Sequence, residues 1–344
     1  MRYKLFGRSG LRVSELCLGA MTFGRDDGFW QFGSDSAESR KIFDAFTNAG
    51  GNFIDTAFVY GNGRSEELVG DFVRADRDHF VLATKYSSSL EGDLSKSGTS
   101  RKNMMRCVEQ SLRRLKVDCI DLYWLHVWDD TTPIEEIMRG LDDLVSAGKV
   151  NYIAISDTPA WQISRGNMLA DLRGWAPFIG IQVEYSLLER TAERDLLPMA
   201  HALDLGITAW SPLAGGMLTG KFLDGKGEGR GQHQPMTDRQ RTVTALVVEI
   251  ARELGCTPGQ AALAFIRQQD RFGTITPIIG ARTLPQLQDN LGCLAVTLSP
   301  DQWQRLEQAT APDLGFPHAI LQAPMIRDMV LGGQSDRFDN HRAP

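Results

Sequence analysis

Four side chains of different acidity follow strand-like apolar runs in the first 126 residues of this chain. Asp55 ends the run NFID, Lys85 ends HFVLATK and His126 ends CIDLYWLH. Tyr60 lies five residues after Asp55, in a short glycine-bearing loop. When parallel strands close into a barrel, their C-terminal ends meet at one rim, and such barrels place their reactive groups there. The pattern therefore predicts that these four side chains meet and form a proton-transfer site.

The residue types indicate which proton moves. A phenol with its ordinary pKa near 10 is a weak acid, and an adjacent ammonium lowers that pKa by stabilising the phenolate. We therefore expect Lys85, held by Asp55, to activate Tyr60 as a general acid toward a carbonyl oxygen, which His126 orients or supplies with a relayed proton. Each residue alone also has a structural interpretation, such as a turn cap for Asp55, but four together favour a site. No serine or cysteine nucleophile is implicated, so acyl transfer is not expected.

Short apolar runs alternate with helical patterns along most of the chain, as expected for strands buried on both faces. The strand candidates are 15–19, 52–55, 80–84, 119–125, 152–155, 178–183, 207–210 and 275–279. Helical periodicity covers 36–49, 101–115, 133–147, 190–203 and 242–254, and Thr158-Pro159 marks the start of another helix with Thr158 as its cap. These elements predict an α/β fold, a (β/α)₈ TIM barrel, with a β-hairpin over residues 3–13 before it. A doubly wound sheet is the alternative architecture.

Composition limits the kinds of partner. The 344 residues are 42% hydrophobic with a net charge of −6, which fits one barrel domain over residues 1–344 and gives no basic surface for nucleic acid. No apolar run reaches the ~18 residues that span a membrane, and the N-terminus lacks a signal-peptide pattern. The five cysteines show no CxxC spacing. We expect a reduced cytoplasmic protein without a metal, compatible with a homo-oligomer, with a flexible loop at 222–238 and a C-terminal extension at 311–344.

Six motifs, in order, resemble those of the aldo-keto reductase family. They are NFIDTAFVYGNGRSEELVG (52–70), TK (84–85), DLYWLH (121–126), QVEYSLLER (182–190), AWSPLAGGMLTGK (209–221) and IIGARTLPQLQDN (278–290). The likeness extends from about residue 3 to residue 309 and looks closest to the bacterial and potassium-channel-β-subunit-like branch. It implies a (β/α)₈ barrel, an NADPH or NADP cofactor laid across the rim, and a catalytic tetrad of Asp55, Tyr60, Lys85 and His126.

The resemblance also implies cofactor contacts, which fall into three groups. Those of the nicotinamide are Ser156, Asp157, Gln182 and the stacking residue Trp210. Those of the pyrophosphate are Ser211, Leu213, Gly215 and Lys221, in a loop whose small residues let backbone N–H groups approach. Those of the 2′-phosphate and adenine are Gly280, Arg282, Gln286 and Asn290. The positive charges of Arg282 and Lys221 favour NADP over NAD.

The sequence departs from the family pattern at three positions. Asparagine is usual where this chain has Asp157, and a carboxylate can accept but not donate a hydrogen bond, so carboxamide recognition is altered. Tyrosine is usual at Trp210 and glutamine at Trp124. An indole keeps the flat aromatic face, so stacking should persist.

The combined prediction is a reversible, NADPH-dependent reduction of aldehydes and ketones to alcohols. Aromatic residues near strand ends predict a pocket for aromatic or apolar carbonyl substrates, and they are Phe23, Trp30, Tyr86 and Trp128. Two other functions stay open. One is a regulatory NADPH-binding subunit with slow turnover. The other is a phosphate-sugar isomerase on the same barrel, which would leave Trp210 and Arg282 without a purpose.

Overall fold

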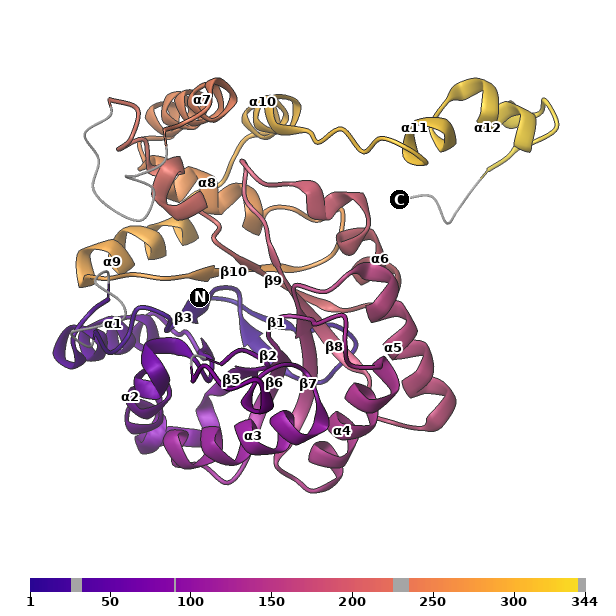
Figure 1. Ribbon diagram of the computed structural model, residues 1–344. Coiled ribbons are helices and arrows are strands. Elements are labelled where there is room, and N and C mark those ends of the chain that lie inside the picture. The colour runs from indigo at the N-terminus through magenta and orange to yellow at the C-terminus, as the bar shows by residue number, and fades with distance from the viewer. Residues whose placement is uncertain (26–32, 90, 225–234, 340–344) are drawn as a thin grey trace.

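The computed structural model describes residues 1–25, 33–89, 91–224 and 235–339. Parallel strands form a closed barrel in the order β10-β3-β4-β5-β6-β7-β8-β9 (Figure 1). Their bounds are β3 (Cys17–Gly19), β4 (Phe53–Asp55), β5 (Val81–Tyr86), β6 (Ile120–Leu125), β7 (Val150–Ser156), β8 (Phe178–Glu184), β9 (Gly206–Trp210) and β10 (Ile275–Ile279). Almost every residue of these strands is buried, because the helices cover their outer face and side chains fill the interior. The predicted TIM barrel is confirmed.

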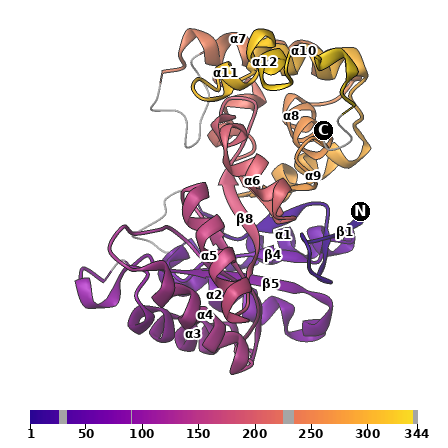
Figure 2. The ribbon, with the colours of Figure 1, turned by 90° about the vertical axis from the view of Figure 1, so that its right-hand side faces the viewer.

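Helices alternate with the strands from α1 to α6, and two helices separate β9 from β10. The helices are α1 (Ser36–Asn48), α2 (Arg64–Val73), α3 (Arg101–Leu115), α4 (Ile134–Ser146), α5 (Ala160–Arg173), α6 (Leu196–Ala202), α7 (Asp238–Leu254), α8 (Pro258–Arg267), α9 (Leu284–Gly292), α10 (Pro300–Thr310), α11 (His318–Leu321) and α12 (Pro324–Val330). Figures 1 and 2 show α2 to α5 around one side of the barrel and α7, α8 and α10 on the other. No helix in the described ranges is long and apolar enough to cross a membrane.

An N-terminal hairpin closes one end of the barrel. Its strands are β1 (Tyr3–Leu5) and β2 (Arg12–Ser14), which pair antiparallel as predicted. Phe6, in the turn, packs edge-on against Phe53 and Trp124 with ring centroids 5.7 and 6.2 Å away. A Cβ at Gly180 or Gly206 would lie only 2.3 or 2.6 Å from that ring, so both positions need glycine. Because Phe53 and Gly206 begin their strands, the hairpin fills the N-terminal end and leaves the opposite rim for a site.

Strand bounds agree with the sequence prediction to within two residues, and α1, α3 and α4 begin within one residue of the predicted starts, whereas α6 and α7 begin six and four residues away from theirs. Pro159, not Thr158, is the residue that precedes the first turn of α5, and the Thr158 hydroxyl donates to the Ser156 carbonyl oxygen at 2.8 Å instead of capping the helix. The helix predicted over 190–203 is a short 3₁₀ turn (Thr191–Arg194) followed by α6, separated at Asp195. Most of the predicted loop at 222–238 lies outside the described residues.

Candidate active site

The four predicted proton-transfer groups lie together at the C-terminal rim of neighbouring strands. Asp55 ends β4 and Lys85 lies in β5 beside it, where the Lys85 ammonium forms an ion pair with the Asp55 carboxylate. The same Nζ donates to the Thr56 carbonyl oxygen at 2.8 Å and to the Tyr60 hydroxyl at 3.3 Å. The His126 ring lies edge-on to the Tyr60 ring, with centroids 5.7 Å apart. The amine therefore bridges the acid and the phenol, and the imidazole lies beside the phenol.

A buried glutamate holds the elements that carry the amine and the phenol. Glu66, in α2, accepts a hydrogen bond from the Thr84 hydroxyl at 2.7 Å, directly beside Lys85 in β5. Its other oxygen accepts from Arg114 at 3.1 Å, and Arg114 also donates to the Phe58 carbonyl oxygen at 2.9 Å in the loop before Tyr60. The sequence motif contains Glu66, but its role was missed. A carboxylate on the buried face of an amphipathic helix is the signal that points to such a partner.

The charges of the amine and its partner are set by competition between burial and their contact. Burial lowers the pKa of Lys85, but the neighbouring Asp55 and Tyr60 more than offset this, so the pKa lies above its ordinary value. Burial raises the pKa of Asp55, and Lys85 opposes part of that rise. Lys85 therefore stays positively charged where it contacts the phenol.

The phenol and the imidazole are both neutral at physiological pH. Burial raises the pKa of Tyr60 and the Lys85 ammonium lowers it, with a net pKa above the ordinary value. The predicted influence of Lys85 has the right sign, but the predicted net lowering is wrong because burial is the larger effect. Burial, and then Lys85, lower the pKa of His126 to about 3. The site thus offers a protonated hydroxyl and an uncharged imidazole.

A cavity of about 590 Å³ extends from this group along the rim. Asp55, Tyr60 and His126 line one end, while Lys85 is fully buried behind them. Every residue predicted to bind the cofactor also lines this cavity. They are Ser156, Asp157, Gln182, Trp210, Ser211, Leu213, Gly215, Lys221, Gly280, Arg282, Gln286 and Asn290. The volume is in the range of cofactor sites, about 300–1,000 Å³.

At the end of the cavity nearest the tetrad, two side-chain hydrogen bonds connect Gln182 with Asp55 and Trp210 with Asp157. The Gln182 amide nitrogen donates to Oδ1 of Asp55 at 3.2 Å. The Trp210 indole Nε1 donates to Oδ1 of Asp157 at 3.1 Å. Burial raises the pKa of Asp157, and the hydrogen bond from Trp210 opposes that rise. Gln182 therefore orients Asp55, and Asp157 orients the indole.

The middle of the cavity is bordered by a loop with left-handed backbone. Ser211, Ala214, Gly215 and Gly216 have φ values of 53°, 49°, 65° and 93°. The Gly215 amide donates to the Ser211 hydroxyl at 3.3 Å, which fixes the turn. Left-handed residues curve the backbone so that amides face a common centre, a geometry that suits anions.

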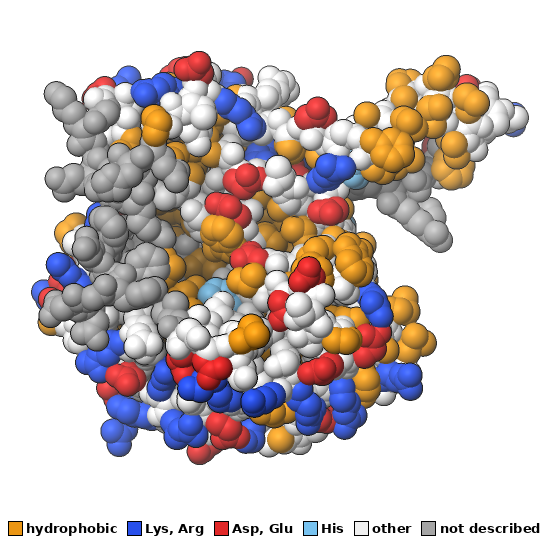
Figure 3. Space-filling model, viewed as in Figure 1, with side chains coloured by type: hydrophobic (Ala, Val, Ile, Leu, Met, Phe, Trp, Pro, Cys, Tyr) orange, Lys and Arg blue, Asp and Glu red, His pale blue; other side chains and the backbone are white. Residues whose placement is uncertain are grey.

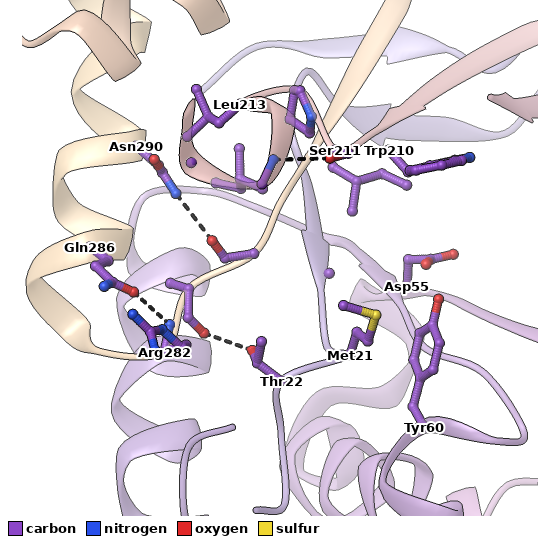
Figure 4. Close-up of a pocket in the computed structure, with 18 of the residues that line it drawn as sticks. Met21, Thr22, Asp55, Tyr60, Trp210, Ser211, Leu213, Arg282, Gln286 and Asn290 are labelled. Carbon is purple, nitrogen blue, oxygen red and sulfur yellow. Dashed lines mark hydrogen bonds between the residues drawn. The ribbon is translucent and has the colours of Figure 1, made fainter. Parts of the chain in front are cut away.

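The far end is polar and positively charged (Figure 4). Gly280 and Ala281 follow β10, and their carbonyl oxygens accept hydrogen bonds from Asn290 at 3.3 Å and Thr22 at 2.7 Å. The Gln286 side chain accepts from the Arg282 backbone amide at 2.9 Å. Lys221 and Arg282 both line this cavity, and burial, followed by the charge of Arg282, lowers the pKa of Lys221. Figure 4 shows this group at the opposite side of the cavity from Asp55 and Tyr60.

The predicted substrate-pocket aromatics are placed elsewhere. Tyr86 is fully buried and stacks on Tyr123, with centroids 5.3 Å apart. Phe23 is 1% exposed and packs edge-on against Phe72. Both belong to the hydrophobic core between the barrel and its helices, so the expectation that they line the cavity is corrected.

Of the other two predicted pocket residues, only Trp128 lies in the described part of the chain, and two cavity residues were not predicted. Trp128 is partly buried against the core and contacts Trp161, but does not line the cavity, and Trp30 lies outside the described residues. Trp124, noted as a departure from the family, is fully buried against the hairpin. Met21 and Thr22 do line the cavity and were not predicted. They follow the end of β3, so their position just past a barrel strand was the available signal.

Comparison with known proteins agrees with this geometry. The model of the "Aldo/keto reductase family" matches residues 15–311. An aryl-alcohol dehydrogenase [NADP(+)] of Phanerodontia chrysosporium is 38% identical, with 90% of this chain and 86% of that protein covered. A norsolorinic acid reductase of Emericella nidulans is 37% identical, covering 91% of this chain and 82% of that protein. A putative aryl-alcohol dehydrogenase of Saccharomyces cerevisiae is 33% identical over 91% and 87%. The chain belongs to the aldo/keto reductase family.

Proposed function

We propose that this protein interconverts carbonyl compounds and alcohols by hydride transfer with NADP(H), acting on aromatic or apolar substrates. The observation that carries the proposal is the Lys85 ammonium, which contacts both the Asp55 carboxylate and the Tyr60 hydroxyl at the wall of the cavity. A protonated phenol beside a fixed positive charge is suited to donate a proton to a carbonyl oxygen, because the charge stabilises the phenolate that remains.

The donor set of the cavity fits a nicotinamide dinucleotide. Trp210 offers a flat aromatic face near the tetrad, and the left-handed loop after it turns toward the middle of the cavity. Lys221 and Arg282 offer positive charge at the far end, beside the first turn of α9. An aromatic plate, an anion-binding loop and two cations match a ring, a pyrophosphate and a further phosphate in that order. The cations support NADP(H) over NAD(H), and so does the name of the Phanerodontia relative.

Each residue of the tetrad has its own role in the reaction. When bound, the nicotinamide supplies or accepts the hydride at its C4 atom. In the reducing direction Tyr60 gives its hydroxyl proton to the substrate oxygen as the carbonyl carbon gains the hydride. Lys85 stabilises the resulting phenolate, Asp55 holds Lys85, and solvent returns the proton to Tyr60. His126 is neutral, so its ring nitrogen can donate a hydrogen bond that orients the carbonyl without adding charge.

Two observations support an aromatic or apolar substrate. Met21 and Trp210 line the cavity near Asp55 and Tyr60 (Figure 4), and Ile278 and Ile279 also line it. The relatives are named for aryl alcohols and norsolorinic acid. Adaptable sulfur and flat indole surfaces favour ring-bearing ligands.

The test follows absorbance of the reduced nicotinamide with a panel of aromatic and aliphatic aldehydes, and its appearance with aryl alcohols. Tyr60→Phe should lower kcat by roughly 10²–10⁴-fold while cofactor binding is retained. Tyr3→Phe is the matched control, because the Tyr3 hydroxyl bonds only the Gly50 carbonyl among the described residues and lies in the hairpin. A Tyr60→Phe enzyme that reduces aldehydes as fast as wild type would refute the assigned role.

A further inference from the structure

The C-terminal segment stands away from the barrel. In Figure 1 the segment containing α11 and α12, in yellow, extends from α10 at the upper right, joined by a stretch without helix or strand. No residue after Leu306, within the described part of the chain, belongs to a hydrophobic core cluster. Arg194 fixes the base of the segment by donating to the Phe316 carbonyl oxygen at 2.9 Å. We call residues 316–338 the arm.

The arm is apolar but exposed. Its large hydrophobic residues with roughly half or more of their surface in solvent are Phe316, Ile320, Leu321, Met325, Met329, Val330 and Phe338. Met325 and Met329 are one helical turn apart on α12 and are 69% and 67% exposed. Figure 3 shows the resulting group of hydrophobic side chains on the arm, set apart from the charged surface of the barrel. Folded chains that stay monomeric seldom expose apolar groups so densely, so the arm needs a partner surface.

The barrel carries a second exposed apolar surface, on α5. Trp161, Met168 and Leu172 are 60%, 60% and 75% exposed, and their spacing puts them on one face of the helix. Arg165 lies between them on the same face, but its guanidinium forms an ion pair with Glu135 of α4. We call these three apolar residues the α5 stripe. Spacings of seven and four residues are those by which one helix packs against another, yet this face meets solvent.

The two surfaces are placed so that two copies can cover both at once. α5 and α12 lie on the right of Figure 1, and both are on the side that Figure 2 turns toward the viewer. When two surfaces share one side of a molecule, a two-fold axis can bring each against its complement in a second copy. A large apolar side chain offers on the order of 100 Å² for burial, so the ten such residues of each copy provide at most on the order of 2,000 Å² in a dimer. Covering most of them reaches the range of a specific dimer, about 1,200–2,000 Å².

We propose that the arm of one copy docks on the α5 stripe of a second copy, and the reverse, in a reciprocal dimer. The occupant is a second copy because the described part of each chain carries both surfaces, and because the arm has no net charge that would select a charged partner, since Arg327 and Arg337 are matched by Asp328 and Asp336. Methionines on both sides, Met325 and Met329 against Met168, can adapt to each other without close prior complementarity.

Sedimentation velocity and light scattering of the full chain test this proposal. Wild type should have about twice the mass of one 38.1 kDa chain, or a multiple built from such dimers. Met325→Glu with Met329→Glu should raise the dimer dissociation constant about tenfold or more, and so should Leu172→Glu, since each puts charge in the buried contact. The matched control is Leu5→Glu, at a residue that is 59% exposed in the hairpin, and it should leave the mass unchanged. Unchanged circular dichroism in each variant shows that the barrel is folded.

Cross-linking then decides between docking on a second copy and docking on the same chain. Chains with Met329→Cys and chains with Leu172→Cys, carrying tags of different mass, should form a mixed cross-linked dimer, whereas Leu5→Cys chains should not. A monomeric wild type overturns the proposal, even if its arm binds another surface such as a phospholipid vesicle. An oligomer that persists in all the glutamate variants also overturns the proposal. So does a chain carrying both Met329→Cys and Leu172→Cys that forms the cross-link only within itself and never with a second copy. Loss of the oligomer through the arm alone overturns α5 as the docking surface.

Discussion

The Trp210 indole donates a hydrogen bond of 3.1 Å to the Asp157 carboxylate at the tetrad end of the cavity. These are two of the positions at which the sequence departs from the family pattern of tyrosine and asparagine, and the structure shows that the two departures form one contact. An indole nitrogen can only donate and a carboxylate can only accept, so each residue meets the requirement of the other. Asp157 has a φ of 42°, a backbone conformation that Asp and Asn tolerate better than most residues.

We expect this contact to be energetically coupled to cofactor binding. Trp210→Phe keeps an aromatic plate but removes the donor, and Asp157→Ala removes the acceptor. Each single change should weaken NADPH binding about tenfold or more, as expected for loss of one hydrogen bond to a charged group, about 1.5–3 kcal/mol. The double variant should be much less impaired than the product of the two single effects, because the second change removes a partner already lost. Titration of NADPH fluorescence measures all four dissociation constants, and purely multiplicative effects would contradict the coupling.

The buried pair of Lys85 and Asp55 should be more costly to break than to remove. Lys85→Met leaves the Asp55 carboxylate buried without its cation, and we expect a loss of about 3–5 kcal/mol in the free energy of unfolding. Adding Asp55→Asn removes the unpaired charge and should restore part of that stability, although activity stays low in both variants. Chemical denaturation of wild type and the two variants provides the comparison. If the double variant is the less stable one, burial of an unpaired charge is not the cause.

The barrel could be predicted from the sequence because its strands are buried on both faces and read as unbroken apolar runs. The site could be predicted because barrel topology alone brings strand ends such as Asp55, Lys85 and His126 to one rim. Some helix starts were harder to predict from the sequence, because they depend on single hydrogen bonds. Thr158 has the right type for a cap, but its hydroxyl bonds the Ser156 carbonyl oxygen instead.

Tyr86 and Phe23 were wrongly predicted to line the substrate pocket, because a position near a strand end does not say which way a side chain points. Successive residues in a strand face opposite sides. Lys85 points into the barrel toward Asp55, so Tyr86 must point outward, where it stacks on Tyr123 under the helices. Alternation along β5 would have excluded Tyr86. Phe23 turns back into the core against Phe72, and only tertiary packing decides that.

His126 should make the protein less stable in acid. Its pKa is about 3 when folded and about 6.5 in an unfolded chain, so below 6.5 the unfolded state binds a proton that the folded state does not. Stability should therefore be unaffected by this group above pH 6.5 and should fall as the pH drops from 6.5 toward 3. One proton contributes at most about 1.4 kcal/mol per pH unit, and partial exposure of the ring reduces that.

The comparison uses His126→Gln, which cannot gain that proton. Relative to wild type, its denaturation midpoint should improve steadily as the pH is lowered through this window. His201→Gln, on the exposed surface of α6, is the matched control and should follow wild type. A constant difference between wild type and His126→Gln at every pH would show that the imidazole is not held neutral by burial.

Arg282 should decide between the two nicotinamide cofactors. It lies beside the first turn of α9 and close enough to Lys221 to lower the pKa of that lysine, although burial of Lys221 is the larger cause. A phosphate near both cations would gain charge-assisted hydrogen bonds that a ribose hydroxyl cannot match. Arg282→Ala should therefore weaken NADPH binding about tenfold or more and change NADH binding little, as measured by calorimetry with each cofactor alone.

Arg282→Lys should recover only part of the lost NADPH affinity, because an ammonium does not reproduce the planar fork of donors of a guanidinium. The dependence of NADPH affinity on salt should also become shallower in Arg282→Ala, whereas Arg327→Ala on the arm should match wild type. Equal losses for NADPH and NADH would place the arginine elsewhere than at the 2′-phosphate.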